Sequence, residues 1–107
     1  MDRFKKKAKE LVSQMTAEEK CSQLKYDSPT IERLGIPAYN WWNEGLHGVA
    51  RAGTATMFPQ AIGMAAAFDT EMMHRLGTAI SLEARAKYNY ASAEGDRDIY
   101  KGLTLWS

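Results

Sequence analysis

Apolar residues recur at helical spacing at the start of the chain. Phe4, Ala8 and Leu11 lie at i, i+4 and i+7, with Val12 next to them. This spacing predicts an α-helix with one apolar face. The opposite face carries charged side chains, at Lys5, Lys6, Lys7, Lys9 and Glu10. We interpret these charges as a solvated face in preference to a surface that binds an acidic partner.

A second helix is predicted from Ala17. Thr16 and Glu19 have the spacing of a capping box, in which each residue satisfies a backbone N–H of the other. Ala17, Cys21 and Leu24 would share the inner face of this helix. We therefore expect Cys21 to be a small core residue, because no histidine or cation is placed to activate it as a thiol nucleophile.

Short elements are predicted next. The stretch SPTIERLG (residues 28–35) reads as a helical turn, with Ser28 as its cap, Pro29 at its first position and Gly35 at its end. A strand is expected over residues 38–42, followed by a glycine-containing loop over residues 44–56.

The second half of the chain predicts a strand, a long helix and a last strand. The run of small residues at 62–67 resembles a buried strand. Asp69 caps a helix over residues 70–89, and LTLWS (residues 103–107) reads as the last strand. The expected buried stripe of the long helix consists of Met72, Met73, Leu76, Ala79, Ile80 and Ala84. On the same helix, His74 has no second ligand nearby, so we interpret it as a surface residue.

Three strands separated by long connections, one of them a helix, predict a parallel α/β arrangement. The last strand has nothing after it to pack on, so we expect the chain to be the N-terminal part of a larger protein. Within it, residues 1–35 would form lead-in helices, and residues 36–107 would carry the first strands, the loop and the crossover helix.

Composition removes several function classes. Hydrophobic residues make up 45% of the 107 residues and the net charge is +1, so a polyanion such as nucleic acid is a poor candidate partner. The single cysteine cannot form an internal disulfide. No signal peptide and no membrane span are recognised, and we expect a cytoplasmic protein.

The stretch YNWWNEGLHG (residues 39–48) carries the candidate chemistry. It follows a predicted strand, and the loops at the C-terminal ends of parallel strands form the functional face of such folds. Glu44 could serve as a general acid or nucleophile, as a metal ligand, or as a hydrogen-bond acceptor for a polar ligand. Metal binding is weakly supported, because Glu44 and His47 alone supply too few ligands. A carboxylate beside indoles suits sugar binding, but core packing of the tryptophans explains the same pattern.

The chain resembles glycoside hydrolase family 3, and within it the β-xylosidases and β-glucosidases. The resemblance extends over residues 11–107, and the strings NWWNEGLHGVA and FPQAIG are its most specific parts. The family implies a (β/α)8 barrel of TIM type, of which this chain would supply about three strands, and retaining hydrolysis of β-glycosides from the non-reducing end. The implied ligand is a β-linked oligosaccharide or an aryl or alkyl glycoside. Neither a cofactor nor a metal is implied.

The resemblance also implies roles for single residues. The position of Glu44 is that of a family acid that binds hydroxyls of the sugar in subsite −1. Trp42 would form the wall of this subsite, Trp41 would point into the barrel, and His47 would position the loop through a hydrogen bond. One departure is Gly45, where relatives commonly have alanine in NEALHG.

No segment matches the family motifs of the nucleophile or the acid/base, so we expect the chain alone to lack both catalytic carboxylates and to be inactive. It would then need the rest of the barrel, from the same parent chain or from a complementing chain. A sugar-binding fragment or module is the alternative. Arg97 and Asp98 also match the family, and we interpret them as a structural ion pair. The preference between xylosides and glucosides stays open.

Overall fold

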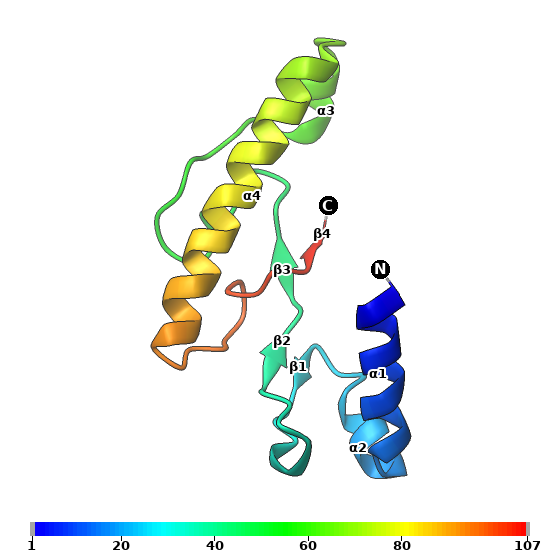
Figure 1. Cartoon of the computed structure of the whole chain (residues 1–107). Helices are drawn as coiled ribbons and strands as arrows, with labels where there is room; N and C mark the ends of the chain where they lie inside the picture. The colour runs from blue at the N-terminus through cyan, green and yellow to red at the C-terminus, as the bar shows by residue number, and fades with distance from the viewer. Residues whose placement is uncertain (1, 107) are drawn as a thin grey trace. The chain divides into compact units, whose positions relative to one another are not determined.

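A computed structural model describes residues 2–106, and the chain divides into two compact units, Met1–Tyr39 and Asn40–Ser107. Its short strands form two two-stranded sheets, β1 with β2 and β3 with β4 (Figure 1). The structure is thus a small mixed arrangement of helices and strands. Among the described residues no closed barrel is formed. None of the helices built from these residues is long and apolar enough to cross a membrane.

The first unit contains α1 (Asp2–Gln14), α2 (Ala17–Ser22), β1 (Asp27–Ser28) and the 3-10 helix η1 (Glu32–Leu34). The capping box predicted at the start of α2 is confirmed. The Thr16 N–H donates to Glu19 Oε2 at 2.8 Å, and the Glu19 N–H donates to Thr16 Oγ1 at 3.2 Å. These bonds satisfy N–H groups that the first turn of a helix leaves free.

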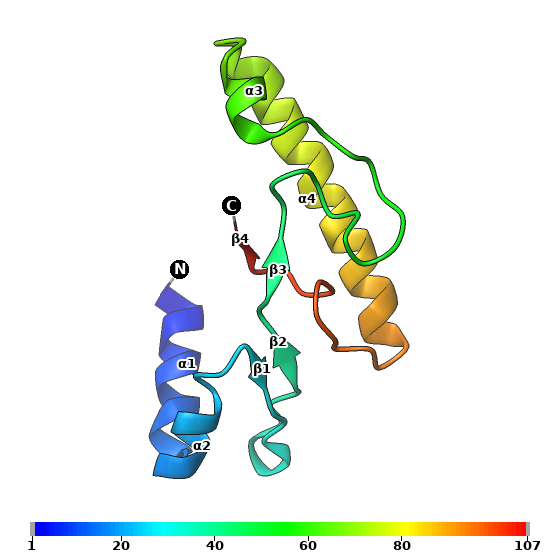
Figure 2. The ribbon, with the colours of Figure 1, turned by 180° about the vertical axis from the view of Figure 1, so that it is seen from behind.

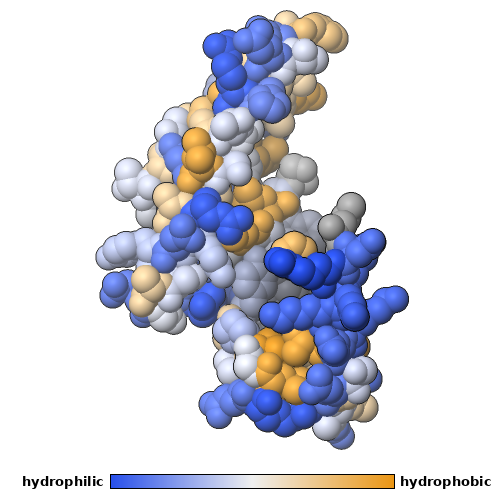
Figure 3. Space-filling model, in the orientation of Figure 1, coloured by the Kyte–Doolittle hydropathy of each residue, from blue (hydrophilic) through white to orange (hydrophobic). Residues whose placement is uncertain are grey.

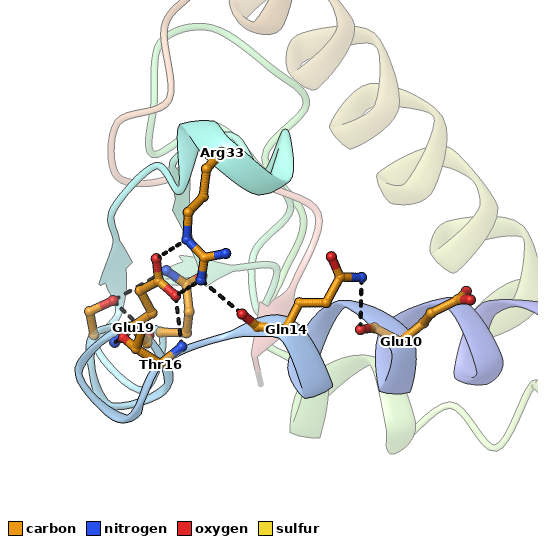
Figure 4. A network of polar contacts seen from close by, with 7 residues as sticks. Glu10, Gln14, Thr16, Glu19 and Arg33 are labelled. Atoms are coloured by element: carbon orange, nitrogen blue, oxygen red, sulfur yellow. Dashed lines mark hydrogen bonds and ion pairs between the residues drawn. The ribbon is translucent and has the colours of Figure 1, made fainter.

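Arg33 connects three parts of the first unit (Figure 4). Its Nε donates to Glu19 Oε1 at 2.8 Å, its Nη2 donates to the carbonyl of Gln14 at 2.8 Å, and Nη2 also contacts Glu19 Oε2. The hydrogen bond from Arg33, followed by that from the Thr16 backbone, lowers the pKa of the Glu19 carboxyl. Arg33 therefore connects η1 to the end of α1 and the start of α2.

The start expected for the helical turn over residues 28–35 is wrong, because η1 begins at Glu32 and not at Pro29. Ser28 does not cap the helical turn, because it lies in β1 and its hydroxyl donates to the carbonyls of Gln23 at 3.2 Å and Lys25 at 2.9 Å. The residue before η1 is instead Ile31, while the end at Gly35 is confirmed by its left-handed φ of 63°.

Cys21 is also not a core residue, because its side chain is exposed, as is that of Leu24. The α2 helix has six residues and no buried side chain. The apolar face of α1 is likewise not buried, since Phe4 is 68% exposed. An amphipathic pattern identifies the apolar side of a helix, but whether a second layer covers that side depends on the tertiary structure.

The second unit contains β3 (Asn43–Glu44), α3 (Ala61–Ala65), α4 (Thr70–Ala93) and β4 (Leu105–Trp106). Strands β3 and β4 are parallel, with Asn43 opposite Leu105 and Glu44 opposite Trp106. Figures 1 and 2 show the two strands side by side from opposite directions. The connection between them contains α3 and α4, so the predicted parallel α/β unit is confirmed for this pair.

The strand expected over residues 38–42 is interrupted at the two tryptophans. Strand β2 covers Tyr39–Asn40 only, and β3 begins at Asn43. The reason is local, because Asn40 Oδ1 accepts the N–H of Trp42 at 2.9 Å. An asparagine side chain that bonds the backbone two residues later forms a turn.

The strand expected over residues 62–67 is wrong, because α3 occupies Ala61–Ala65. The predicted strand contains one β-branched residue, Ile62, and four alanines or glycines. Alanine favours helix over strand. A short apolar run of this kind cannot be assigned by periodicity alone.

The long helix is confirmed and extends four residues further than expected, to Ala93. Asp69 Oδ1 accepts the N–H of Met72 at 2.8 Å, as predicted for its cap. In the expected stripe only Ala84 is fully buried, and the other five side chains are partly exposed. The space-filling view shows apolar patches on the visible face (Figure 3).

Candidate functional site

A pocket of about 330 Å³ lies where the WWNE stretch meets the last strand. It is lined by Trp41, Trp42, Asn43, Glu44 and Trp106. The first two residues come from the turn between β2 and β3, the next two from β3, and Trp106 from β4. Three indoles, one amide and one carboxylate therefore surround a single cavity.

The two neighbouring tryptophans face the same pocket. We expected them to point in opposite directions, as adjacent residues of a strand do. That expectation is wrong, because both residues lie in the turn between the strands. Trp41 packs against Trp106, with ring centroids 5.6 Å apart and an interplanar angle of 48°, and Trp106 Nε1 donates to the Trp41 carbonyl at 2.8 Å. Trp42 is 52% exposed.

Glu44 is paired with Arg51, which the sequence analysis did not identify. Arg51 Nη1 donates to Glu44 Oε1 at 3.2 Å, and the Arg51 guanidinium lies over the Tyr100 ring, 5.4 Å from its centroid. Tyr100 has a left-handed φ of 65°, and its N–H donates to the Trp42 carbonyl at 3.1 Å. Glu44, Arg51, Tyr100 and Trp42 thus form a chain of contacts that begins and ends at residues of the pocket.

Asn43 is a second residue that the sequence analysis missed. Its side chain is buried, Nδ2 donates to the Asn40 carbonyl at 3.1 Å, and Oδ1 accepts the N–H of Gly102 at 2.8 Å. It therefore fixes the segment that leads into β4 against β3. The available signal was its type, since asparagine is rare inside strands unless its amide is used.

His47 makes the hydrogen bond that was predicted for it. Its Nδ1 donates to the carbonyl of Phe58 at 3.0 Å, while the Phe58 N–H donates to the His47 carbonyl at 2.9 Å. Because a carbonyl can only accept, Nδ1 carries the proton of this hydrogen bond. A smaller cavity of about 170 Å³ is lined by His47, Arg51 and Glu44, among others.

Two glycines that follow Glu44 in the sequence, Gly45 and Gly48, differ in whether they can accommodate a side chain. Gly48 has φ 90°, and a Cβ there would lie 2.6 Å from the Thr56 carbonyl oxygen. A Cβ at Gly45 would lie 3.5 Å from Leu105 Cδ1, an ordinary contact. The alanine of related sequences therefore fits at position 45, whereas position 48 requires glycine.

Arg97 and Asp98 do not pair, so their interpretation as a structural ion pair is wrong. Arg97 Nη1 donates to the Tyr88 hydroxyl at 3.2 Å and lowers the pKa of that hydroxyl, while Asp98 Oδ1 accepts the N–H of Ile99 at 2.7 Å. The ion pair in this region joins Lys101 to Asp96 instead. Within residues 2–106, no group of three or more His, Cys, Asp or Glu side chains is arranged to hold a metal ion.

Comparison with known proteins identifies relatives over nearly the whole chain. It is 45% identical to a probable β-D-xylosidase 7 of Arabidopsis thaliana, in an alignment that covers 95% of this chain and 14% of the relative. It is 45% identical to a probable exo-1,4-β-xylosidase of Aspergillus flavus, with 94% and 13% covered, and 38% identical to a xylan 1,4-β-xylosidase of Xylanibacter ruminicola, with 96% and 12% covered.

Over nearly its whole length, this chain is similar to one segment of proteins named β-xylosidases. It spans about one eighth of the length of these relatives. No family model and no solved structure matches it.

Proposed function

We propose that this chain is part of a retaining, exo-acting β-xylosidase of glycoside hydrolase family 3, and that its WWNE pocket binds the sugar at the non-reducing end of the substrate. The observation that carries this proposal is the placement of Glu44 beside Trp42 in one pocket, in a chain whose relatives are named β-xylosidases. The proposed parent fold is a (β/α)8 barrel, to which β3, α4 and β4 would contribute.

The pocket has the chemistry that a sugar needs. The exposed Trp42 indole offers an apolar face for the C–H groups of a pyranose ring. The Glu44 carboxylate accepts hydrogen bonds from hydroxyls, and a hydrogen bond to a charged acceptor contributes about 1.5–3 kcal/mol. Among the described residues Arg51 bonds Oε1, which leaves Oε2 for a sugar hydroxyl.

Glu44 is assigned to binding and not to bond cleavage. A retaining glycosidase needs two carboxyl groups about 5–5.5 Å apart across the scissile bond. Glu44 is paired with a guanidinium, and its role here is to recognise the sugar. The nucleophile and the acid/base are proposed to belong to parts of the parent protein outside this chain, which would be inactive alone.

Selection between xylose and glucose is assigned to the length of Glu44. Glutamate is one methylene longer than aspartate and would reach into the space that the C6 hydroxymethyl group of a hexose occupies. The test is Glu44→Asp in a longer protein that contains this chain, with Glu71→Asp on the exposed face of α4 as the matched control. The ratio of kcat/KM for aryl xyloside to that for aryl glucoside should fall in Glu44→Asp only, and an unchanged ratio would contradict this assignment.

A non-catalytic sugar-binding segment is the second candidate, because all five pocket residues belong to this chain. Titration of the chain with xylose, followed by Trp fluorescence, tests binding, and an aryl-xyloside assay tests hydrolysis. Binding without hydrolysis fits both candidates, and activity in the longer protein then separates them. Hydrolysis by the chain alone, at a rate above that of Glu44→Ala, would contradict the role given to Glu44.

A further inference from the structure

A second pocket of about 350 Å³ lies between α4 and the glycine-containing loop. One wall is a single face of α4, on which Lys87, Tyr90, Ala91 and Glu94 follow each other at i, i+3, i+4 and i+7. Ala52 and Thr54 of the loop, together with Asp96 and Lys101 after the helix, complete the lining.

The helix end brings Asp96 back over this face. The Asp96 N–H donates to the Ala91 carbonyl at 2.8 Å, and the Gly95 N–H donates to the Ser92 carbonyl at 3.2 Å. These two bonds and the left-handed φ of 74° at Gly95 make a Schellman motif. Asp96 then pairs with Lys101, so both charges are fixed at the pocket.

The loop wall is fastened to α4 by one carboxylate. Glu83 accepts the Thr56 N–H at 3.0 Å and the Thr56 hydroxyl at 2.5 Å. Because Glu83 lies one turn before Lys87, this contact holds the loop over the lysine. The lysine Nζ lies beside Gly53, where a Cβ would be only 3.8 Å away from it.

The Lys87 amine is the feature of this pocket that indicates a ligand. Its Nζ is buried although the side chain as a whole is partly exposed, and it has no hydrogen-bond partner among the described residues. Desolvation lowers the pKa of Lys87, and the neighbouring Glu83 opposes this change. A buried amine without an acceptor is costly, and an oxygen atom placed in the pocket would satisfy it.

The charges of the lining decide which oxygen-bearing ligand fits. Lys87 and Lys101 are balanced by Glu94 and Asp96, so the pocket has no excess charge that would favour an anion or a cation. A neutral ligand rich in hydroxyls can accept from an amine and donate to a carboxylate. The Tyr90 ring, 75% exposed at the rim, offers a face for C–H groups.

We infer that this pocket is a second carbohydrate-binding site, separate from the WWNE pocket, at which Lys87 donates to a sugar hydroxyl and Tyr90 contacts the sugar ring. A site of this kind would bind a further unit of a xylose polymer. The choice of xylose rests on the proposed function, whereas the preference for a neutral polyhydroxylated ligand rests on the lining alone.

The test is an NMR titration of the ¹⁵N-labelled chain with xylotriose and, separately, with inorganic phosphate. Xylotriose should shift the amide signals of Gly53 and Gly95, and Lys87→Met should weaken this response about tenfold. Lys9→Met, on the exposed face of α1, is the matched control and should leave it unchanged. Tyr90→Ala should weaken it about twofold to tenfold and serves if Lys87→Met does not fold.

The outcomes separate this inference from the proposed function. Shifts at residues 41–45 alone would overturn the second site and leave the function standing. Shifts at Gly53 and Gly95 alone would support the second site and count against the WWNE pocket. A response of these two glycines to phosphate and not to xylotriose would identify an anion site and overturn the inference, and the absence of any response to xylotriose would overturn both.

Discussion

The Arg51 guanidinium donates a 3.2 Å hydrogen bond to the carboxylate of Glu44, the residue to which sugar recognition is assigned. Both side chains are well exposed, at 59% and 40%. An ion pair with this exposure contributes at most about 1 kcal/mol to stability. Its importance therefore lies in the direction it gives to the carboxylate.

Arg51→Met should separate these two effects. The free energy of unfolding should change by less than about 1 kcal/mol, because the pair is exposed. The binding free energy for xylose should weaken by more than the free energy of unfolding changes, because Glu44 loses the partner that orients it. Urea unfolding and a xylose titration measure the two quantities, and Arg75→Met on α4 is the control. An affinity equal to that of the unchanged chain would show that Glu44 needs no such partner.

Gly48→Ala and Gly45→Ala form a matched pair at the pocket loop. The first should destabilise the chain by about 1–3 kcal/mol, because it combines a left-handed φ with a contact of 2.6 Å to the Thr56 carbonyl. The second should change stability by less than about 1 kcal/mol, since the methyl group meets Leu105 at ordinary contact distance. Denaturant midpoints of the two variants measure the difference, and equal midpoints would contradict it.

Asn43→Ala should cost about 1–3 kcal/mol, because it leaves the Gly102 N–H and the Asn40 carbonyl without their partner in a buried position. The exposed Asn89 of α4, changed to alanine, is the control and should have little effect. The environment of Trp106 should also change, since Asn43 holds the segment before β4. Tryptophan fluorescence reports this, and an unperturbed spectrum would argue against the anchoring role.

Lys87→Met should change how stability depends on pH. Burial lowers the pKa of Lys87 in the folded chain below its ordinary value. Between these two values the unfolded chain holds more protons, so the free energy of unfolding rises with pH over this range. The variant lacks this rise, and the opposite contribution of Lys101, whose pKa is raised by Asp96, is present in both proteins and cancels. The stability of the unchanged chain relative to the variant should therefore increase from neutral to alkaline pH, as measured by urea unfolding.

Features that depend on neighbouring residues were predictable from sequence. The Thr16–Glu19 box and the Asp69 cap each involve partners three residues apart, so residue type and spacing are sufficient. The parallel relation of β3 and β4 followed from the long helical connection between them. In the second unit, the hydrogen bond of His47 was also predicted.

Features that depend on tertiary contacts were not predictable. The contact between Asn43 and Gly102 joins positions 59 residues apart, and nothing in the local sequence indicates it. The same holds for Arg51, whose partners come from β3 and from the segment before β4. Cys21 was predicted to be a core residue, but a helical pattern does not indicate whether another layer covers that side of the helix. The segment of α3 was predicted to be a strand, because a short run of small residues is compatible with a helix and with a strand.

The closure of the WWNE pocket has a kinetic consequence. Trp106 and Trp41 are 65 positions apart, so the pocket exists only after a long loop has closed. Contacts within α4 are local, and helices of this size form in about 0.1–1 μs. Non-local strand pairing is slower, because the chain entropy lost on closure precedes the gain from the contacts. The WWNE pocket is therefore among the last parts of the chain to assemble, and mutations that weaken β4 should slow its appearance while leaving early helix formation intact.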